Sequence, residues 1–558
     1  MIQWAKCNEK KWGRNMKAFS QIDFGYGDAA NYKNNRKYKE FFSKVFVKDE
    51  KLERLMREDT YYLIGDKGTG KTAYSVFLEN NEYQNTQSRV INLEATDYKI
   101  FLNLKKLGFL QLSDFSRVWK IILLLITAES IQKDNIASFG PKRSALFEEL
   151  KAKIDNYYEN AYIPEIANSV KYIFDEACGL QGGISFNSLG LGSNIQGNIA
   201  EKMITEFVVQ KFQNNLADME RQFCAAFSRL KINKNKFIFI DSIDVKLDDI
   251  TEPEYQACIQ GLANAIWSVN TDVFRAMPES NGFLKVVLSI RTDMFSKLNL
   301  HNQANKVRDN SVLLDWRTTY KNYTTSPLFQ LCNNLLSYDN PIENGQAPWD
   351  YYFPWFTDST NIEKRANDSS FINCLRFSLS RPRDMISIMK AIQNQHKKNK
   401  GSKVTTLEDF KNDDTENEIS NYYIDEAKDW CLHKFSDKEF ITLTFFFQFL
   451  DGKSKFDYQE FRDAFEEYQQ QVSDRKMDIF EEILDADAFL QLLYDLNMIC
   501  YYEKDRHGND LFRFCYRERE IYNLSPQVKT NSVYGVHYAL LRALNLGWTP
   551  MPSEADID

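Results

Sequence analysis

The stretch from residue 65 to residue 72 has the residue types and the spacing of a phosphate-binding loop. It reads Gly65-Asp66-Lys67-Gly68-Thr69-Gly70-Lys71-Thr72 and matches the pattern G-x-x-x-x-G-K-[ST]. We expect Gly65, Gly68 and Gly70 to adopt positive φ, so that backbone N–H groups can approach phosphate oxygens. Lys71 would bind the β- and γ-phosphates, and the Thr72 hydroxyl would ligate Mg²⁺. The sequence therefore predicts a site for ATP and Mg²⁺.

The segments on either side of this loop provide the context that such a loop needs. Residues 60–64 are strand-prone, and residues 73–78 have a helical pattern that begins at Ala73. The N-terminus of that helix adds a partial positive charge, so Ala73 is included among the predicted nucleotide-binding residues. The alternative interpretation is a glycine-rich turn before an ordinary helix.

Three further apolar stretches complete a predicted α/β domain. Residues 89–93, 236–241 and 284–291 read as buried strands, and long helical segments separate them. Strands that alternate with helices indicate a parallel sheet with flanking helices. The stretch 236–241 ends in Asp241, an acid that would lie at the edge of the sheet and could bind Mg²⁺ there.

The composition is that of an ordinary globular protein. Of the 558 residues, 43% are hydrophobic and 27% are charged, and the formal net charge is −8. This balance does not point to nucleic acid as an obligatory partner. The nine cysteines include no C-x-x-C pair, which favours a reducing compartment over a zinc or disulfide framework.

The sequence shows no clear targeting or membrane signal. The N-terminus lacks the apolar run of a signal peptide, and the most apolar stretch, residues 118–128, is much shorter than a membrane span. That stretch is interpreted as a buried helix. We therefore expect a cytoplasmic protein without a membrane partner.

The chain divides into segments by pattern. A glycine-rich stretch at about residues 179–198 reads as a hairpin or extended loop, either an oligomer or partner contact or a flexible excursion. Residues 533–544 read as a final helix. The expected segments are an N-terminal arm (1–57), a core that carries the loop and the glycine-rich insertion (58–330), a helical lid (331–405), a winged-helix-like domain (406–525), and a C-terminal helix with an acidic tail (526–558).

Together these motifs resemble those of bacterial P-loop ATPases of the AAA+/STAND group, near the NACHT, KAP and origin-recognition-like branches. The resemblance is carried by residues 65–72, 237–244, 289–291 and the motif Arg381-Pro382-Arg383-Asp384. It implies an α/β P-loop core followed by an α-helical lid and a winged-helix-like domain, with hydrolysis of Mg-ATP. The chain also resembles a subfamily common in bacterial antiphage defence loci, in which K-G-T-G-K-T and R-P-R-D motifs recur.

The resemblance also implies roles for two residues that follow predicted strands. Asp244 matches the acid that NACHT- and KAP-like proteins use to orient or deprotonate the attacking water, whereas Ser242 departs from the pattern of many AAA+ proteins. The alternative for Asp244 is a helix N-cap. Arg291 stands where STAND proteins often carry an arginine that senses the γ-phosphate. The alternative for Arg291 is a surface charge.

A second phosphate sensor would be Arg383, at a helix start in the lid-like region. A structural salt bridge is the alternative for Arg383, and Arg381 is a weaker candidate for the same role. The adjacent Asp384 suits the first turn of a helix, where an acid complements the dipole. No arginine finger can be assigned, since Arg308 and Arg317 are candidates by position alone.

The sequence leaves two main classes of function open. One is a regulatory ATPase that forms homo-oligomers and acts through a separate effector protein, and the other is a DNA-associated loader or initiator. The candidate recognition helix at residues 484–498 contains three aspartates and no Lys or Arg, although DNA readers normally supply cations there. On the hairpin, only Lys504, Arg506, His507 and Arg513 are basic. A protein partner is therefore favoured over nucleic acid, and a third possibility, an inactive scaffold, is disfavoured because the loop and its acids occur together.

Overall fold

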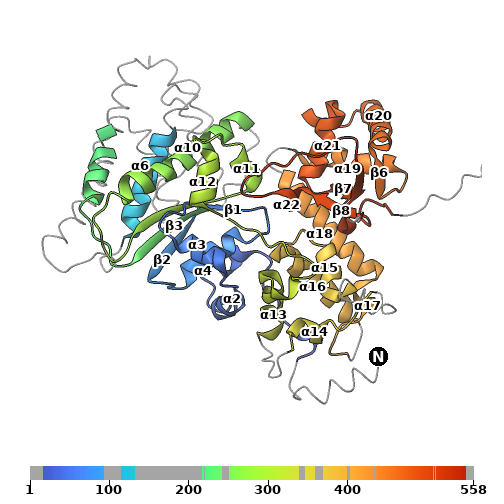
Figure 1. The fold of residues 1–558 in the computed structure, drawn as a ribbon, viewed down its shortest axis with the longest axis horizontal. Coiled ribbons are helices and arrows are strands. Elements are labelled where there is room, and N and C mark those ends of the chain that lie inside the picture. Colours follow the sequence, from blue (N-terminus) through green and yellow to red (C-terminus); the bar gives the residue numbers. More distant parts are fainter. Residues whose placement is uncertain are drawn as a thin grey trace, which may run out of the picture. The chain divides into compact units, whose positions relative to one another are not determined.

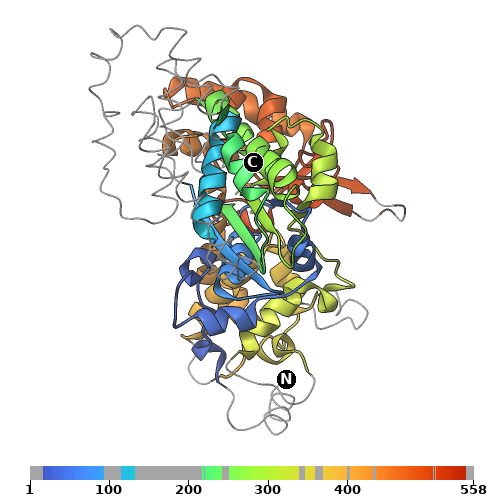
Figure 2. The ribbon, with the colours of Figure 1, turned by 90° about the vertical axis from the view of Figure 1, so that its left-hand side faces the viewer.

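The structure is a computed structural model, shown in Figures 1 and 2. It describes residues 17–93, 115–131, 217–218, 220–241, 251–338, 346–357, 368–398, 402–431, 435–504, 506, 508 and 510–547. The chain forms two compact units. One, here called the parallel-sheet unit, comprises Glu50–Asp66 and Lys71–Leu314. The other, here called the antiparallel-sheet unit, comprises Met1–Asp49, Lys67–Gly70 and Asp315–Asp558.

The parallel-sheet unit is built on a five-stranded sheet in the order β2-β3-β4-β1-β5, and every pair of neighbouring strands is parallel. Its strands are β1 (Tyr62–Ile64), β2 (Thr86–Asn92), β3 (Asn235–Asp241), β4 (Leu284–Ile290) and β5 (Ser311–Leu313). Strands β1 and β4 are buried along their whole length, as expected when helices cover both faces. The predicted α/β core is thereby confirmed.

The four predicted strands are present, and β5 is an additional one. It has only three residues and directly follows helix α12 (Gln303–Asn310). It pairs with the other edge of β1, where Leu63 lies opposite Val312. Strand β4 lies between β1 and β3, with Ile64 opposite Ile290 and Ile240 opposite Leu288.

Helices cover both faces of this sheet (Figure 1). They include α3 (Glu50–Met56), α4 (Lys71–Asn80), α6 (Phe115–Ser130), α10 (Glu252–Ser268) and α11 (Thr292–Ser296). Helix α6 contains the apolar stretch 118–128 and is buried on nearly every side, which confirms the interpretation as a buried helix. In the part of the chain that the structure describes, no helix has both the length and the apolar composition that a membrane span requires.

The first part of the antiparallel-sheet unit is helical and poor in strands. Its helices are α2 (Lys39–Val45), α13 (Pro327–Ser337), α14 (Pro348–Tyr352), α15 (Ser370–Arg376), α16 (Pro382–His396), α17 (Leu407–Phe410) and α18 (Asp413–Cys431). The N-terminal arm is anchored to α16, because Gln393 donates hydrogen bonds to the carbonyls of Phe19 and Ile22. Phe19 also packs edge-on against Phe353.

The last part of this unit has the chain order helix, strand, helix, helix, hairpin. Its elements are α19 (Asp437–Phe445), β6 (Lys455–Asp457), α20 (Tyr458–Asp474), α21 (Ala486–Asp495), β7 (Ile499–Lys504), β8 (Asp510–Phe514), α22 (Cys515–Glu518) and β9 (Val533–Val536). The strands form a four-stranded antiparallel sheet in the order β6-β9-β7-β8.

The prediction of a final helix at residues 533–544 is wrong. Val533–Val536 is strand β9, and only Tyr538–Leu540 forms a short 3₁₀ turn. The strand is favoured because it fills the space between β6 and β7, where Gly535 lies opposite Cys500. A Cβ at Gly535 would lie 2.6 Å from the Tyr502 hydroxyl, so a side chain at this position would require the Tyr502 ring to move.

Candidate functional site

The predicted phosphate-binding loop follows strand β1 directly. Gly68 and Gly70 have φ values of +81° and +96°, as expected for a loop that turns its N–H groups inward. The expectation of positive φ at Gly65 is wrong. This residue continues the strand, because its N–H donates a hydrogen bond of 3.2 Å to the carbonyl of Ile290 on β4.

The side chain of Lys71 is held within the loop. Helix α4 begins at this residue, two positions before the expected start, and Lys71 is only 8% exposed. Its ammonium donates to the carbonyls of Gly65 at 2.9 Å and Asp66 at 3.2 Å. The charge therefore lies at the concave side of the loop, next to the helix N-terminus, which is the arrangement that binds anions.

The predicted metal-binding acid lies at the end of strand β3. Asp241 is 4% exposed and lies opposite Asn92 of β2, and its carbonyl accepts a hydrogen bond from Leu93. An aspartate this deeply buried needs a counter-charge or donors, because burial penalises an isolated carboxylate. Asp244 and Ser242 lie outside the described residues, so the role of Asp244 stays a prediction.

Arg291 follows strand β4 and is buried, with 2% of its surface exposed. The surface-charge alternative for Arg291 is therefore wrong. Its Nε donates to Asp293 Oδ1 at 3.0 Å, and a terminal nitrogen donates to Asp293 Oδ2 at 2.9 Å. This two-point pair fixes the guanidinium at the first turn of α11. Sequence analysis did not identify Asp293 as its partner.

The ends of three neighbouring strands bring these residues to one edge of the sheet. Strand β1 leads into the loop, β4 into Arg291, and β3 into Asp241, and these strands are adjacent in the order β1-β4-β3. Carboxyl ends of parallel strands are where α/β proteins bind ligands. The donor set is suited to Mg²⁺, since the Thr72 hydroxyl and the Asp241 carboxylate are hard oxygen ligands.

The tip of the loop, Lys67–Gly70, belongs to the antiparallel-sheet unit and contacts side chains there. A terminal nitrogen of Arg381 donates to the carbonyl of Lys67 at 2.8 Å, and Trp316 Nε1 donates to the carbonyl of Thr69 at 2.8 Å. A Cβ at Gly68 would lie 3.3 Å from the Cβ of Arg383. Sequence analysis missed Trp316, because nothing in its neighbourhood marks a residue that binds a distant carbonyl.

The R-P-R-D motif is organised by Asp384, whose carboxylate is fully buried. It accepts hydrogen bonds from Nε of Arg381 at 3.0 Å and from a terminal nitrogen of Arg381 at 2.7 Å. The Tyr422 hydroxyl and the backbone N–H of Leu379 donate to it as well, each at 2.9 Å. Burial, together with the Asp384 carboxylate, raises the pKa of Tyr422 well above its ordinary value, so this phenol remains a donor. Asp384 therefore anchors Arg381, a role beyond the expected dipole complement.

Arg383 forms a salt bridge in the structure, as the alternative interpretation of this residue expects. Its role as a phosphate sensor stays a prediction. Its guanidinium lies 3.3 Å from Glu426 Oε1 on helix α18. Lys67 forms an ion pair with Asp429 on the same helix and lies 3.9 Å from Glu426. Arg381 also lies 3.4 Å from Glu426, so three cations, on the loop tip and at the start of α16, converge on two acids of α18.

The two arginine-finger candidates are each paired with a carboxylate. Arg308 donates to Asp309 at 2.9 Å, and Arg317 donates to Asp315 through Nε and a terminal nitrogen. Each arginine therefore has a carboxylate partner within two residues, and Arg317 also donates to the carbonyl of Arg517. Neither arginine is singled out by these contacts as a finger.

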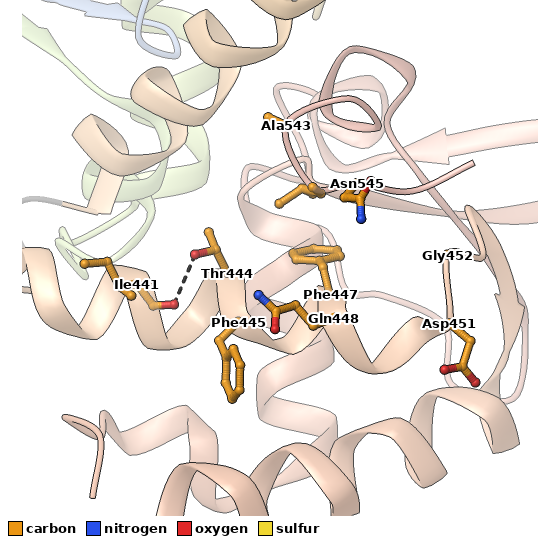
Figure 3. Close-up of a pocket in the computed structure, with 10 residues that line it drawn as sticks. Ile441, Thr444, Phe445, Phe447, Gln448, Asp451, Gly452, Ala543 and Asn545 are labelled. Carbon is orange, nitrogen blue, oxygen red and sulfur yellow. Dashed lines mark hydrogen bonds between the residues drawn. The ribbon is translucent and has the colours of Figure 1, made fainter. Parts of the chain in front are cut away.

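Two hollows lie in the last part of the antiparallel-sheet unit. One has a volume of about 510 Å³, and Figure 3 shows it with the Thr444 hydroxyl donating to the Ile441 carbonyl. It is lined by Ile441, Thr444, Phe445, Phe447, Gln448, Asp451, Gly452, Ala543, Leu544 and Asn545. The other, of about 640 Å³, lies against strands β6 to β9. None of the predicted site residues lines either hollow.

Comparison with known proteins adds no assignment. No protein-family model matches this chain, and no curated protein does.

Proposed function

We propose that this protein is a regulatory ATPase that binds and hydrolyses Mg-ATP at the loop that follows β1. The observation that carries the proposal is the arrangement of Lys71, Arg291 and Asp241 at the ends of three adjacent parallel strands. A nucleotide polyphosphate requires a loop of N–H donors, a cation beside it, and an oxygen ligand set for the metal. The edge of this sheet supplies all three.

Each residue has a defined part in the proposed site. The Lys71 ammonium would exchange its contacts with the Gly65 and Asp66 carbonyls for phosphate oxygens. Thr72 and Asp241 would hold Mg²⁺, which when bound neutralises charge on the β- and γ-phosphates. Asp244 would orient the attacking water.

Arg291 contributes a fixed positive charge at the same edge. Because Asp293 already binds its guanidinium at two points, Arg291 is oriented before any ligand arrives. We propose that this orientation lets it respond to the γ-phosphate.

The last part of the antiparallel-sheet unit is proposed to be a winged-helix-like domain that contacts a protein. Helix α21 carries no Lys or Arg, and two cations of the hairpin, Lys504 and Arg513, are already paired with acids. Lys504 lies 2.5 Å from Asp510, and Arg513 contacts Glu503 at 2.9 Å and Glu518 at 3.1 Å. DNA phosphates would have to displace these carboxylates, so a protein partner fits this surface better than DNA.

The partner is proposed to be a separate effector protein in a bacterial antiviral system, with ATP-dependent homo-oligomers as the active form. This part of the proposal depends on the resemblance of the loop and the R-P-R-D motif to those of defence ATPases. The alternative, a DNA-associated loader, would be favoured by specific duplex binding at physiological salt.

The central test is ATP binding by wild type and by Lys71→Ala, with Lys297→Ala as the matched control. Lys297 is an exposed lysine of the same unit, and it lies outside the loop. We expect Lys71→Ala to weaken ATP binding by about tenfold to a hundredfold, the range for losing one charge-assisted hydrogen bond. Lys297→Ala should bind as wild type does. Equal affinities for wild type and Lys71→Ala would contradict the proposal.

A further inference from the structure

The acid Glu426 on α18 contacts cations from two distant parts of the chain. Its carboxylate lies 3.3 Å from Arg383, 3.4 Å from Arg381 and 3.9 Å from Lys67. Only 11% of its side chain is exposed, so these ion pairs are poorly screened by solvent. Glu426 therefore links the tip of the loop to helices α16 and α18.

The three cations do not depend on Glu426 equally. Arg381 is neutralised by Asp384 through hydrogen bonds of 2.7 Å and 3.0 Å, and that pair is buried. Arg381 is therefore the fixed member of the cluster. Among the described residues, Arg383 has Glu426 as its carboxylate partner, and Lys67 shares its charge between Glu426 and the half-exposed Asp429.

The position of these cations matters because the loop tip is next to them. Arg383 lies over Gly68, since a Cβ at Gly68 would be 3.3 Å from its Cβ, and Lys67 is itself a loop residue. A phosphate group at this loop would be a second anion competing for the same two cations. Two like charges that share cations oppose each other, so an anion at the loop and the Glu426 carboxylate cannot both be fully neutralised.

We propose that Glu426 is a positioning residue that holds Lys67 and Arg383 as their counter-ion and gives them up to the terminal phosphate of ATP. This inference rests on the proposed function, because it assigns a regulatory role at the same loop. ADP lacks the γ-phosphate and competes less for these cations. Glu426 therefore sets the preference between ATP and ADP by opposing ATP binding.

The experiment compares ATP and ADP dissociation constants for wild type, Glu426→Gln, Glu426→Asp and Glu418→Gln by titration calorimetry. Glu418 is on the same helix and accepts a hydrogen bond from exposed Asn394, so Glu418→Gln is the matched control. We expect Glu426→Gln to tighten ATP binding about fivefold or more relative to ADP, the lower end of typical coupling between sites. Glu426→Asp and Glu418→Gln should keep the wild-type ratio.

A second variant keeps the test decisive if Glu426→Gln does not fold. Lys67→Gln removes a cation for which the two anions compete, and we expect it to lower the preference for ATP. If Glu426→Gln folds, the double variant Lys67→Gln/Glu426→Gln should show a smaller increase in ATP preference than Glu426→Gln alone. The reason is that both changes act on the same interaction. An unchanged ratio in Glu426→Gln, or in Lys67→Gln where only that variant folds, would overturn the inference. Failure of wild type itself to bind ATP would instead overturn the proposed function.

Discussion

At the scale of single residues, buried charges in this protein are held by specific partners. Arg291 and Asp293 are both buried and are joined by two hydrogen bonds. A buried ion pair adds little stability compared with apolar side chains of similar volume. Removing one partner, however, leaves the other charge buried without its counter-ion. The same pair that orients Arg291 therefore makes its removal strongly destabilising.

We predict that Arg291→Ala lowers the free energy of unfolding by about 3–5 kcal/mol, because the Asp293 carboxylate loses its counter-ion. The measurement is chemical denaturation of wild type, both single variants and the double variant Arg291→Ala/Asp293→Ala. The double variant should lose less than the sum of the two single losses. Additive losses would show that the two side chains do not act as a pair.

A buried histidine gives the second prediction at this scale. His396 Nδ1 lies 2.9 Å from Asp409, and its Nε2 lies 3.2 Å from the carbonyl of Ser402. Both partners are acceptors, so the ring is best satisfied when both nitrogens carry protons. The hydrogen bond with Asp409 raises the pKa of His396 above its ordinary 6.5, although burial opposes this.

The pH dependence follows from the sign of this shift. A raised folded-state pKa gives stability that is complete below pH 6.5 and is lost as pH rises through the folded-state value. Burial lowers the pKa of His537 to about 4, so that residue acts oppositely and costs stability as pH falls below 6.5. Urea unfolding measured across this pH range should show that the free energy of unfolding declines above pH 6.5 in wild type. This decline should disappear in Asp409→Asn. A decline that persists in Asp409→Asn would assign it to another group.

At the scale of elements, the packing of α6 on α10 depends on one glycine. A Cβ at Gly261 would lie 2.8 Å from the Cβ of Phe115 and 3.2 Å from its backbone carbon. The two helices therefore approach more closely than a side chain at this position would allow. This contact also keeps the apolar surface of α6 covered.

We predict that Gly261→Val destabilises the parallel-sheet unit by about 2 kcal/mol or more, because a buried helix must shift to admit the new side chain. Asn264→Val on the same helix is the control, since Asn264 is only partly buried. Thermal unfolding of the two variants should separate them clearly. Similar losses in both would mean that helix propensity, and not the close approach, decides the effect.

At the scale of the whole molecule, the proposed function requires that nucleotide state changes assembly. The loop tip contacts Arg381 and Trp316 and is next to Glu426 and Asp429 of α18, all within the antiparallel-sheet unit. A nucleotide shifts the equilibrium between the unassembled and assembled protein only if it binds one of these two states more tightly than the other.

We predict that ATP with Mg²⁺ raises the mass of the wild-type protein in light scattering after size exclusion, and that Lys71→Ala shows no such rise. Lys297→Ala should behave as wild type does. Because the assay reports mass, it does not depend on knowing the effector. A rise that Lys71→Ala retains would mean that assembly is independent of the loop.

The sequence by itself determined the features that are encoded locally. The apolar runs that became β3 and β4, the loop with Gly68 and Gly70 in left-handed conformations, and Asp241 at a strand end all depend on neighbours within a few residues. Periodicity and glycine positions report such features directly. The α/β core could therefore be predicted from the amino-acid sequence alone.

Only the tertiary structure decided which distant residues meet. The place of β4 between β1 and β3 depends on strand order, and the bonds from Arg381 to Lys67 and from Trp316 to Thr69 join segments more than 200 residues apart. The pair of Arg383 with Glu426 joins two different helices. Val533–Val536 is likewise a strand that pairs with β6 on one side and with β7 on the other. Such pairings depend on how apolar faces pack across the whole chain, and no local pattern specifies them.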